Sequence, residues 1–587
     1  MKMKRWISRV MALALAMTMI IGMNMCALAE TSNWTFNNLK QGEQVRAYRL
    51  FNRKEKANTS SEGTTSYDVS YTLNDTYAGF FSRAGGACAG LSGDQLSVAA
   101  YQYVAALATD DKTAERSQFA ADMWKWILEN KKTADCTQTV AAGSNSVTLS
   151  LEPGYYLMYP TGANVVDGTT AKSPAILKDI SGREEDADRT LAIKSTYPTV
   201  EKKIVPTTNA SGITLQKIIN DNWETIIHME LEDETDEEDS FAPYGAADEK
   251  SATDLAIGDT VTYQLTSKVP DMTGYTSYTY QFKDTLSKGL DLKEVLSVYV
   301  GTSELKAKKS GANTYALAYD AATRTLTITF NDCINTFKSH VGETITVKYS
   351  ATLNKDAVVG TDPNTNKVKV EYSNNPETNG TGESEETNAK VYTFGFDIYK
   401  YTLKDITGDD NDSNRVSLKG AQFKLYKDNE GTKGAAVKLI KNGDGVYYQD
   451  DKTTSPVEYV ETTADGKLTI KGLKAGTYYL EETKAPVGYN GLKGDIKVEI
   501  NNLQYDTTDP TKLNSYKVTY TMPGAATGTT VTVPTNSMTE IPVLNKAGVT
   551  LPSTGGRGSM AFTVIGVIII GAMMASSLMS KKRKSAE

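Results

Sequence analysis

Short runs in which apolar and polar residues alternate recur along this 587-residue chain. Examples are Val261–Leu265, Thr325–Phe330 and Lys517–Thr521, which are rich in Thr, Val and Tyr. Alternation with a period of two places successive side chains on opposite faces of a strand, and β-branched and aromatic residues favour strands. Gly, Asn and Asp separate such runs at short intervals. The pattern therefore predicts an all-β chain built of tandem β-sandwich domains.

Both ends of the chain carry signals for export and anchoring. Basic residues from Lys2 to Arg9, an apolar stretch from Met11 to Met25 and a small-residue cleavage site at Ala27–Ala29 are typical of a secretory signal peptide, residues 1–29. The apolar run from Met560 to Met579 has the roughly 20 residues that a membrane-spanning helix needs. The basic cluster Lys581–Lys584 follows it and predicts a cytoplasmic C-terminus. The residues between the two signals are therefore expected outside the cell.

A pentapeptide lies just before the apolar run: Leu551, Pro552, Ser553, Thr554 and Gly555. Residues 551–587 resemble the cell wall sorting signal of Gram-positive surface proteins, which consists of LPxTG, a hydrophobic stretch and a basic tail. The resemblance implies that a sortase cleaves between Thr554 and Gly555 and passes the threonine carbonyl to an amine. It further implies a cell wall-anchored protein with peptidoglycan as a partner and only transient contact with the membrane. The alternative is a plain anchor helix preceded by a chance spacer.

Composition excludes several classes of function. The net charge of −8 argues against a nucleic-acid partner. The chain has only two histidines, His228 and His340, which lie far apart, so neither a histidine-based metal site nor a Ser-His-Asp triad is expected. The acidic block Glu230–Asp239 lacks the spaced pattern of a calcium loop and predicts a solvated loop. We therefore expect no metal, no cofactor and no enzymatic turnover.

The mature chain divides into three expected domains, at residues 30–195, 196–386 and 390–548. The first has a helical insert, because residues 95–108 and 115–131 carry apolar residues at helical spacing. Cys88 and Cys136 flank this insert. In an exported protein they can pair as a disulfide, and two separate thiols are the alternative.

Strand parity places three polar residues on apolar faces of the third domain. Lys400 shares its face with Phe394, Phe396 and Ile398; Asn545 shares one with Ile541 and Val543; Glu482 shares one with Tyr478 and Leu480. Buried unpaired charge is unfavourable, so a single cluster explains all three better than three separate accidents.

Such a cluster permits amide formation. Burial lowers the pKa of a lysine and raises that of a carboxyl group, so the amine can be neutral while the acid is protonated. Lys400 can then attack the Asn545 carboxamide while Glu482 shuttles the proton and ammonia leaves, which forms a Lys–Asn isopeptide bond in a single turnover. The alternative is a buried Lys400–Glu482 ion pair with Asn545 as a hydrogen-bonding neighbour.

The segment Tyr478–Tyr489 matches the E-box of Gram-positive pilins, YxLxETxAPxGY, at every specified position. The third domain therefore resembles a CnaB-type immunoglobulin-like domain. In that family the E-box glutamate, here Glu482, catalyses the isopeptide bond. The resemblance thus favours the Lys400–Asn545 bond over the ion pair.

The second domain shows the same arrangement with weaker motifs. Lys202, Asp284 and Asn374 each fall on an apolar strand face. The arrangement resembles the isopeptide-forming second domain of shaft pilins (CnaA-type), in which an aspartate is the catalyst, and it implies a Lys202–Asn374 bond with Asp284 as catalyst. Asn366 has the same parity as Asn374 and is its alternative, as Lys203 is for Lys202. In the first domain Tyr159 stands where the catalytic glutamate would be, so no bond is expected there.

Together these features resemble the major shaft subunit of a sortase-assembled pilus, whose partners are a pilus-type sortase, a housekeeping sortase, other copies of the chain and minor pilins. Shaft pilins usually carry a YPK-type motif, whereas Tyr197-Pro198 is followed here by Thr199. The acceptor lysine is thus displaced from its usual place in the motif. Lys203 is the nearest candidate and Lys194 is the next. The alternative function is a wall-anchored monomeric or pilus-tip adhesin.

Overall fold

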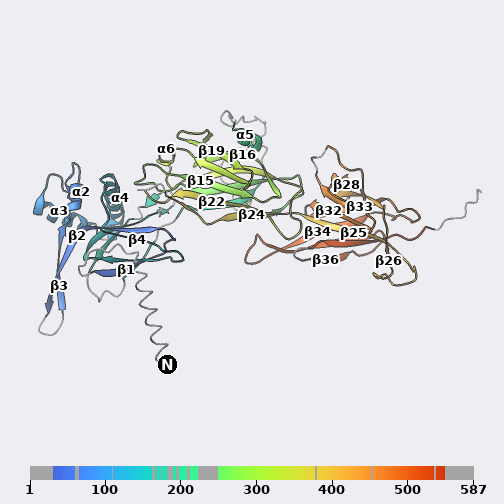
Figure 1. Ribbon diagram of the computed structural model, residues 1–587, viewed down its shortest axis with the longest axis horizontal. Helices are drawn as coiled ribbons and strands as arrows, with labels where there is room; N and C mark the ends of the chain where they lie inside the picture. The colour runs from blue at the N-terminus through green and yellow to red at the C-terminus, as the bar shows by residue number, and fades with distance from the viewer. Residues whose placement is uncertain are drawn as a thin grey trace, which may run out of the picture.

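Three groups of β-sheets follow one another along the long axis of the computed structural model, with the first group at one end and the third at the other (Figure 1). The structure describes residues 31–59, 65–108, 110–161, 165–167, 170–172, 175–181, 189–193, 197–207, 212–221, 249–376, 380–450, 452, 454–534 and 537–548. The expected signal peptide, the acidic block Glu230–Asp239, Lys194, His228 and the sorting signal lie outside these residues. Among the residues described, no helix is long and apolar enough to cross a bilayer, and no cluster of His, Cys, Asp or Glu is suited to hold a metal ion.

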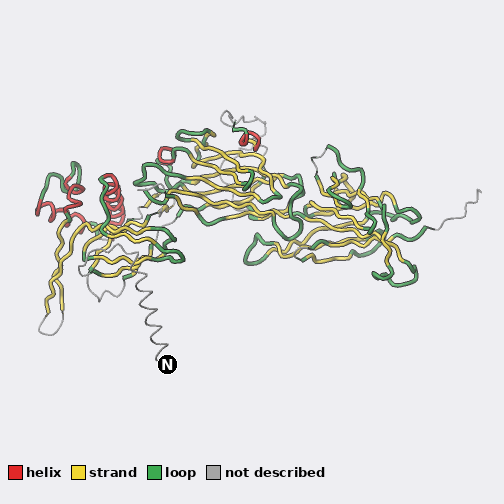
Figure 2. The backbone as a smooth tube through the Cα atoms, in the orientation of Figure 1, coloured by secondary structure: helices red, strands yellow, loops and turns green. Residues whose placement is uncertain are grey.

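The first group packs a sheet of order β10-β1-β5 against a sheet of order β3-β2-β6-β9, in which β4 also pairs with β2. Helices α3 and α4 are the expected helical insert, and Figure 2 shows most of the helical residues gathered on this group. Its elements are β1 (Ser32–Asn37), β2 (Gln44–Thr59), β3 (Thr65–Leu73), η1 (Asp75–Tyr77), α2 (Ala78–Ser82), α3 (Gly93–Ala106), η2 (Asp110–Lys112), α4 (Thr113–Glu129), β4 (Cys136–Thr139), β5 (Val147–Leu151), β6 (Gly154–Pro160), β7 (Val165–Asp167), β8 (Thr170–Lys172), β9 (Ile176–Ile180) and β10 (Thr190–Ala192).

The possible Cys88–Cys136 disulfide does not form, because Cys88 is a free, buried thiol. The two cysteines belong to different cores. Cys88 packs with Phe81 and Phe119 on the helical side of the larger sheet, whereas Cys136 packs with Trp34 and other residues between the two sheets. Flanking positions in the sequence did not predict this, because the sheet separates the two side chains.

The second group is a sandwich of two larger sheets around one core. One sheet has the order β11-β14-β21-β16-β12, and the other has the order β13-β24-β22-β15-β20-β19-β18. Its elements are β11 (Val200–Val205), β12 (Ile213–Thr214), α5 (Leu215–Ile219), β13 (Ala252–Asp254), β14 (Thr260–Lys268), β15 (Tyr280–Leu286), β16 (Leu290–Val300), β17 (Ser303–Glu304), β18 (Lys306–Ala307), β19 (Thr314–Asp320), β20 (Thr325–Phe330), α6 (Cys333–Phe337), β21 (Thr344–Leu353), β22 (Asn364–Ser373), β23 (Thr381–Glu383) and β24 (Thr387–Tyr392).

The third group is also a sandwich with its own core. Its sheets have the orders β26-β25-β32-β30-β29, with β37 paired to β25, and β28-β27-β33-β34-β35-β36. Its elements are β25 (Phe394–Leu403), β26 (Arg415–Ser417), β27 (Gln422–Asn429), β28 (Thr432–Ala436), β29 (Leu439–Lys441), β30 (Val446–Gln449), β31 (Val460–Glu461), β32 (Lys467–Leu473), β33 (Gly476–Lys484), β34 (Ile496–Tyr505), β35 (Leu513–Thr521), β36 (Thr529–Val533) and β37 (Thr539–Leu544).

The second and third groups are joined with almost no linker. β24 ends at Tyr392 and β25 begins at Phe394. Across this junction the Ile257 N–H donates to Gly472 O at 3.0 Å, and the Tyr392 hydroxyl donates to Thr511 O at 2.6 Å. The second and third sandwiches therefore contact each other directly at their junction.

Candidate functional site: two buried lysine–carboxyl–asparagine clusters

The third sandwich encloses the cluster expected from strand parity. Lys400 Nζ lies 3.0 Å from Glu482 Oε1 and donates a hydrogen bond to Asn545 Oδ1. Asn545 Nδ2 donates to the same Glu482 Oε1 at 2.9 Å. The Lys400 and Glu482 side chains are both 0% exposed. The carboxyl group therefore contacts the nucleophile and the leaving nitrogen at once.

Each member of this cluster comes from a different strand. Lys400 lies on β25, Glu482 lies on β33 of the facing sheet, and Asn545 directly follows β37. β25 and β37 pair in parallel with Lys400 opposite Val543, and the Asn545 N–H donates to Tyr401 O at 2.9 Å. This register places the Asn545 side chain beside that of Lys400. The second carboxyl oxygen, Glu482 Oε2, accepts from the Leu492 N–H at 2.8 Å, which fixes the orientation of the acid.

Burial changes the protonation chemistry of the lysine. Removal of the Lys400 ammonium from water lowers its pKa to about 8, although the Glu482 carboxylate opposes the shift. A neutral amine is therefore accessible near physiological pH, whereas an exposed lysine is almost fully protonated there.

The second sandwich encloses a related cluster that bridges its two sheets. Lys202 on β11 donates to Asp284 Oδ2 on β15 and to the hydroxyl of Tyr349 on β21. Asn366 on β22 donates from Nδ2 to the same hydroxyl at 2.7 Å. Burial lowers the pKa of Lys202 to about 8 against the attraction of Asp284, and burial raises the pKa of Asp284. In this cluster a neutral amine and a protonated acid are therefore accessible together.

The structure does not bring Asn374 into this cluster and places its alternative, Asn366, there. Asn374 follows the end of β22, is partly exposed, and its N–H donates to Gly380 O at 3.1 Å. Asn366 is fully buried and lies opposite Leu286, two residues from Asp284. Strand parity could not distinguish Asn366 from Asn374, because they lie an even number of positions apart. Eight residues of strand span about 26 Å, however, so only one of the two can lie beside Asp284. The expectation of a Lys202–Asn374 pair is therefore corrected to Lys202 and Asn366.

Tyr349 was not predicted as part of the site. It lies on the inner face of β21 with Ile345 and Val347, so its sequence pattern is that of an ordinary core residue. Its ring stacks on Tyr263 with 5.3 Å between centroids. Only the pairing of β21 with β14 and the facing of the two sheets bring its hydroxyl to the lysine. The sequence signal that was available is weak: a tyrosine needs a partner for its hydroxyl when it is fully buried.

In the first sandwich the corresponding position has a different surrounding. Tyr159 on β6 is buried, and its ring stacks on Trp124 of α4 with centroids 3.8 Å apart. The residue that aligns in sequence with Glu482 is therefore part of an aromatic stack, and the absence of a bond in the first domain stays a prediction.

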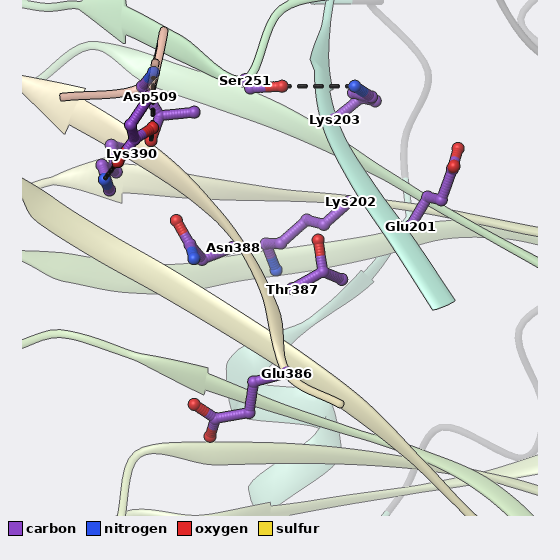
Figure 3. Close-up of a pocket in the computed structure, with 10 residues that line it drawn as sticks. Glu201, Lys202, Lys203, Ser251, Glu386, Thr387, Asn388, Lys390 and Asp509 are labelled. Carbon is purple, nitrogen blue, oxygen red and sulfur yellow. Dashed lines mark hydrogen bonds and ion pairs between the residues drawn. The ribbon is translucent and has the colours of Figure 1, made fainter. Parts of the chain in front are cut away.

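The expected acceptor lysine, Lys203, lies in a polar pocket between the second and third sandwiches. It follows Lys202 on β11 and is partly exposed, because neighbouring residues of a strand point to opposite faces. Its Nζ donates to Ser251 Oγ at 3.3 Å. The pocket has a volume of about 340 Å³, and Figure 3 shows Lys203 at its wall, while Lys390 and Asp509 lie on the other side.

Three family models match separate parts of the chain. A Gram-positive pilin backbone subunit 2, Cna-B-like domain matches residues 257–376, a prealbumin-like fold domain (SpaA) matches residues 404–512, and the LPXTG cell wall anchor motif matches residues 544–587. The fold and these matches define a surface protein of Gram-positive type with tandem Cna-B-like and prealbumin-like domains. The chain thus carries domains that match those of Gram-positive backbone pilins together with an LPXTG anchor, and the anchor motif places it at the cell wall surface. The predicted fold class and location are thus confirmed.

Named relatives are distant. The chain is 25% identical over 254 residues to the fimbrial subunit type 2 of Actinomyces naeslundii, and 22% identical over 307 residues to the trypsin-resistant surface T6 protein of Streptococcus pyogenes serotype M6. These alignments cover 40% and 47% of this chain, and 45% and 48% of the relatives. The chain thus matches less than half of the length of either relative.

Solved structures of backbone pilins resemble the fold. The T6 backbone pilin of serotype M6 Streptococcus pyogenes aligns with a TM-score of 0.44 and 15% identity, over 89% of this chain and 99% of the pilin. The full-length major pilin SpaD from Corynebacterium diphtheriae aligns with a TM-score of 0.38 and 17% identity, over 80% and 91%.

Proposed function

We propose that this chain is the major shaft subunit of a covalently polymerised pilus and that it cross-links itself by two Lys–Asn isopeptide bonds. In this proposal the mature chain has domains at 30–195, at 196 to about 392 and from about 394 to 548. The sequence predicted the second boundary at residues 386–390, but β24 pairs with β13 and β22 and so belongs to the second sandwich. A sortase joins Thr554 of one copy to a lysine of the next, minor pilins complete the fibre, and a housekeeping sortase attaches its base to peptidoglycan. The buried Lys400–Glu482–Asn545 cluster is the observation that carries the self-linking part.

The chemistry follows from the contacts of that cluster. The neutral form of Lys400 attacks Cγ of Asn545, and Glu482 transfers a proton to Nδ2 while it receives one from Nζ. The C–Nδ2 bond breaks, ammonia leaves, and the new Nζ–C amide remains. Glu482 Oε1 serves both transfers because it lies 3.0 Å from Nζ and 2.9 Å from Nδ2. An amide also removes the buried ion pair, whose desolvation is unfavourable.

The second bond joins Lys202 to Asn366, with Asp284 as the acid. These side chains are completely or almost completely buried, and Asp284 and Lys202 are in direct contact. The bond would link β11 in one sheet to β22 in the other, whereas the bond of the third domain links two neighbours in one sheet. Both bonds use the same reaction and release one ammonia each.

Mass spectrometry of the secreted chain tests this proposal. We expect an intact mass lower than the sequence mass by two ammonia molecules, and a cross-linked peptide pair from each domain. Asn366→Ala should remove one of the two deficits, because it deletes the electrophile of the second domain. Asn374→Ala is the matched control and should leave both. A deficit that disappears in Asn374→Ala and persists in Asn366→Ala would contradict the Lys202–Asn366 bond.

The pH dependence of bond formation follows from the shared proton of each pair. The reactive form has a neutral lysine and a protonated acid, so it carries one proton, as the ion pair does. Above the lysine pKa of about 8 the pair loses this proton, and the carboxylate has none to transfer. Chain refolded from denatured, unreacted material should therefore form the Lys400–Asn545 bond at a rate that is flat near neutrality and falls above about pH 8. A rate that climbs steadily with pH would show that only the free amine matters and that Glu482 is no acid.

A further inference from the structure

The hydroxyl of Tyr349 lies at the centre of the second-domain cluster. It accepts hydrogen bonds from Lys202 Nζ and from Asn366 Nδ2, and it donates to Asp284 Oδ2 at 2.7 Å. Both nitrogens that take part in the proposed reaction therefore contact one oxygen atom. The ring is 0% exposed and is held by the stack on Tyr263, which fixes the position of the hydroxyl.

In the third-domain cluster the acid contacts the leaving nitrogen directly, without a bridging hydroxyl. There the leaving nitrogen, Asn545 Nδ2, donates directly to the catalytic carboxyl group, and the aromatic ring near Lys400 Nζ is Phe423, with 5.9 Å from the nitrogen to the ring centroid. The second domain has an aspartate, which is one methylene shorter than a glutamate. The Tyr349 hydroxyl occupies a bridging position between this shorter acid and the leaving nitrogen, because it contacts both Asp284 Oδ2 and Asn366 Nδ2. Among the described residues, neither Asp284 Oδ1 nor Asn366 Oδ1 has a hydrogen-bond partner, so the contacts with Tyr349 and Lys202 are important for the orientation of these groups.

We propose that Tyr349 is a catalytic residue of the second domain and relays the proton from Asp284 to the leaving nitrogen of Asn366. This role rests on the proposed isopeptide bond. Lys202 Nζ attacks Cγ of Asn366, Asp284 gives its proton to the Tyr349 oxygen, and Tyr349 gives its own proton to Nδ2. The C–Nδ2 bond breaks and ammonia leaves. Nζ then gives one proton to Asp284, so the acid and the tyrosine both end as they began.

The rate of bond formation in the Tyr349→Phe variant tests the relay. The full mature chain is refolded from denatured, unreacted material, and cross-linked peptides from both domains are quantified over time. Loss of a positioned acid–base group typically slows a reaction by about 100-fold or more. We expect at least this effect on the Lys202–Asn366 bond and no change in the Lys400–Asn545 bond, which serves as an internal standard in the same molecule. Equal rates of second-domain bond formation in variant and wild type would overturn the relay.

A matched control separates the relay from loss of a buried hydroxyl. Tyr280→Phe removes a hydroxyl from the same core, where it is hydrogen-bonded to Ser267 at 2.7 Å and lies outside the cluster. This variant should form both bonds at the wild-type rate, and equal slowing in Tyr280→Phe and Tyr349→Phe would assign the effect to packing. A ring-fluorinated tyrosine at position 349 gives a second readout, because it makes the hydroxyl more acidic with little change in volume. The relay predicts an altered rate and pH profile, whereas unchanged kinetics would contradict it.

The outcome for the wild type distinguishes this inference from the proposed function. A wild-type second domain with no cross-link would overturn both the bond and the relay. A normal wild-type bond that forms equally fast in Tyr349→Phe would overturn the relay alone and leave the proposed function intact.

Discussion

Replacement of Glu482 by glutamine should turn the third domain from an inextensible element into one that unfolds under load. The glutamine side chain keeps the shape of the glutamate and can still accept from the Leu492 N–H, but it has no acidic proton to transfer, so the Lys400–Asn545 bond should not form. The bond would span 145 positions of the sequence. Single-molecule pulling should therefore show an added extension of about 500 Å in the Glu482→Gln variant, at 3.3–3.6 Å per residue, and none from this domain in the wild type.

The strand arrangement would place the load on the proposed bond. Tension in a shaft enters the third domain at the start of β25 and leaves after β37, towards Thr554. β25 and β37 are parallel neighbours paired from Phe396–Thr539 to Tyr401–Leu544, so force pulls them past each other. Without the amide only their hydrogen bonds and packing resist. With it, force passes from Lys400 to Asn545 through covalent bonds, and the rest of the sandwich is bypassed.

The variant should also be less stable. By analogy with a disulfide that closes a loop of about 100 residues, the missing link should lower the free energy of unfolding by about 4–5 kcal/mol. For a domain of this size that corresponds to a decrease in melting temperature of about 10–20 °C. The matched control is Glu481→Gln, because Glu481 is the neighbouring residue on β33 and lies outside the buried cluster, where it pairs with Lys433 at 2.9 Å. If Glu482→Gln and wild type unfold to the same length and at the same temperature, the clamp does not exist.

Strand parity was sufficient to predict the third-domain cluster. Apolar residues alternate with others just before Lys400, Glu482 and Asn545, so a polar residue on an apolar face is visible without knowledge of the partner strands. We inferred that the three faces meet at one point, because it is unfavourable to bury the three polar side chains separately. The register of β25 with β37 bears this out, because it places Asn545 beside Lys400.

Strand parity did not predict which asparagine joins the second-domain cluster, and the sequence positions of the two cysteines did not show whether they pair. Asn366 and Asn374 have the same parity on β22, and only the pairing of β22 with β15 shows which of them lies beside Asp284. In the sequence Tyr349 cannot be told from an ordinary core residue of β21, because a hydrophobic pattern does not show where the hydroxyl of a buried tyrosine lies. Cys88 and Cys136 flank the helical insert in the sequence, but a sheet separates them in space. In each case the missing information is a distance between strands or layers, which a one-dimensional pattern does not contain.

Replacement of Thr554 should abolish covalent multimers and attachment to the wall together. The sortase reaction transfers the carbonyl of this residue, and residues 544–587 match the LPXTG anchor motif. A denaturing gel of wall extract should show a ladder of multimers for the wild type and no ladder for Thr554→Ala, with the chain found in the membrane or the medium. Ser553→Ala is the matched control, because the motif leaves this position unspecified, and it should preserve the ladder.

Replacement of the acceptor lysine separates polymerisation from anchoring, because a chain with an intact sorting signal can still be joined to peptidoglycan. Lys203→Arg should thus remove the ladder and leave the monomer on the wall, since arginine keeps the charge but is not a nucleophile at physiological pH. Lys390→Arg is the control within the same pocket, where Lys390 pairs with Asp509 at 3.2 Å. A ladder that survives Lys203→Arg and disappears in Lys194→Arg would move the acceptor to the segment before β11. A wild-type extract with monomer alone would overturn the shaft assignment and leave a wall-anchored adhesin, whose isopeptide bonds would then resist tension on single molecules instead of tension along a fibre.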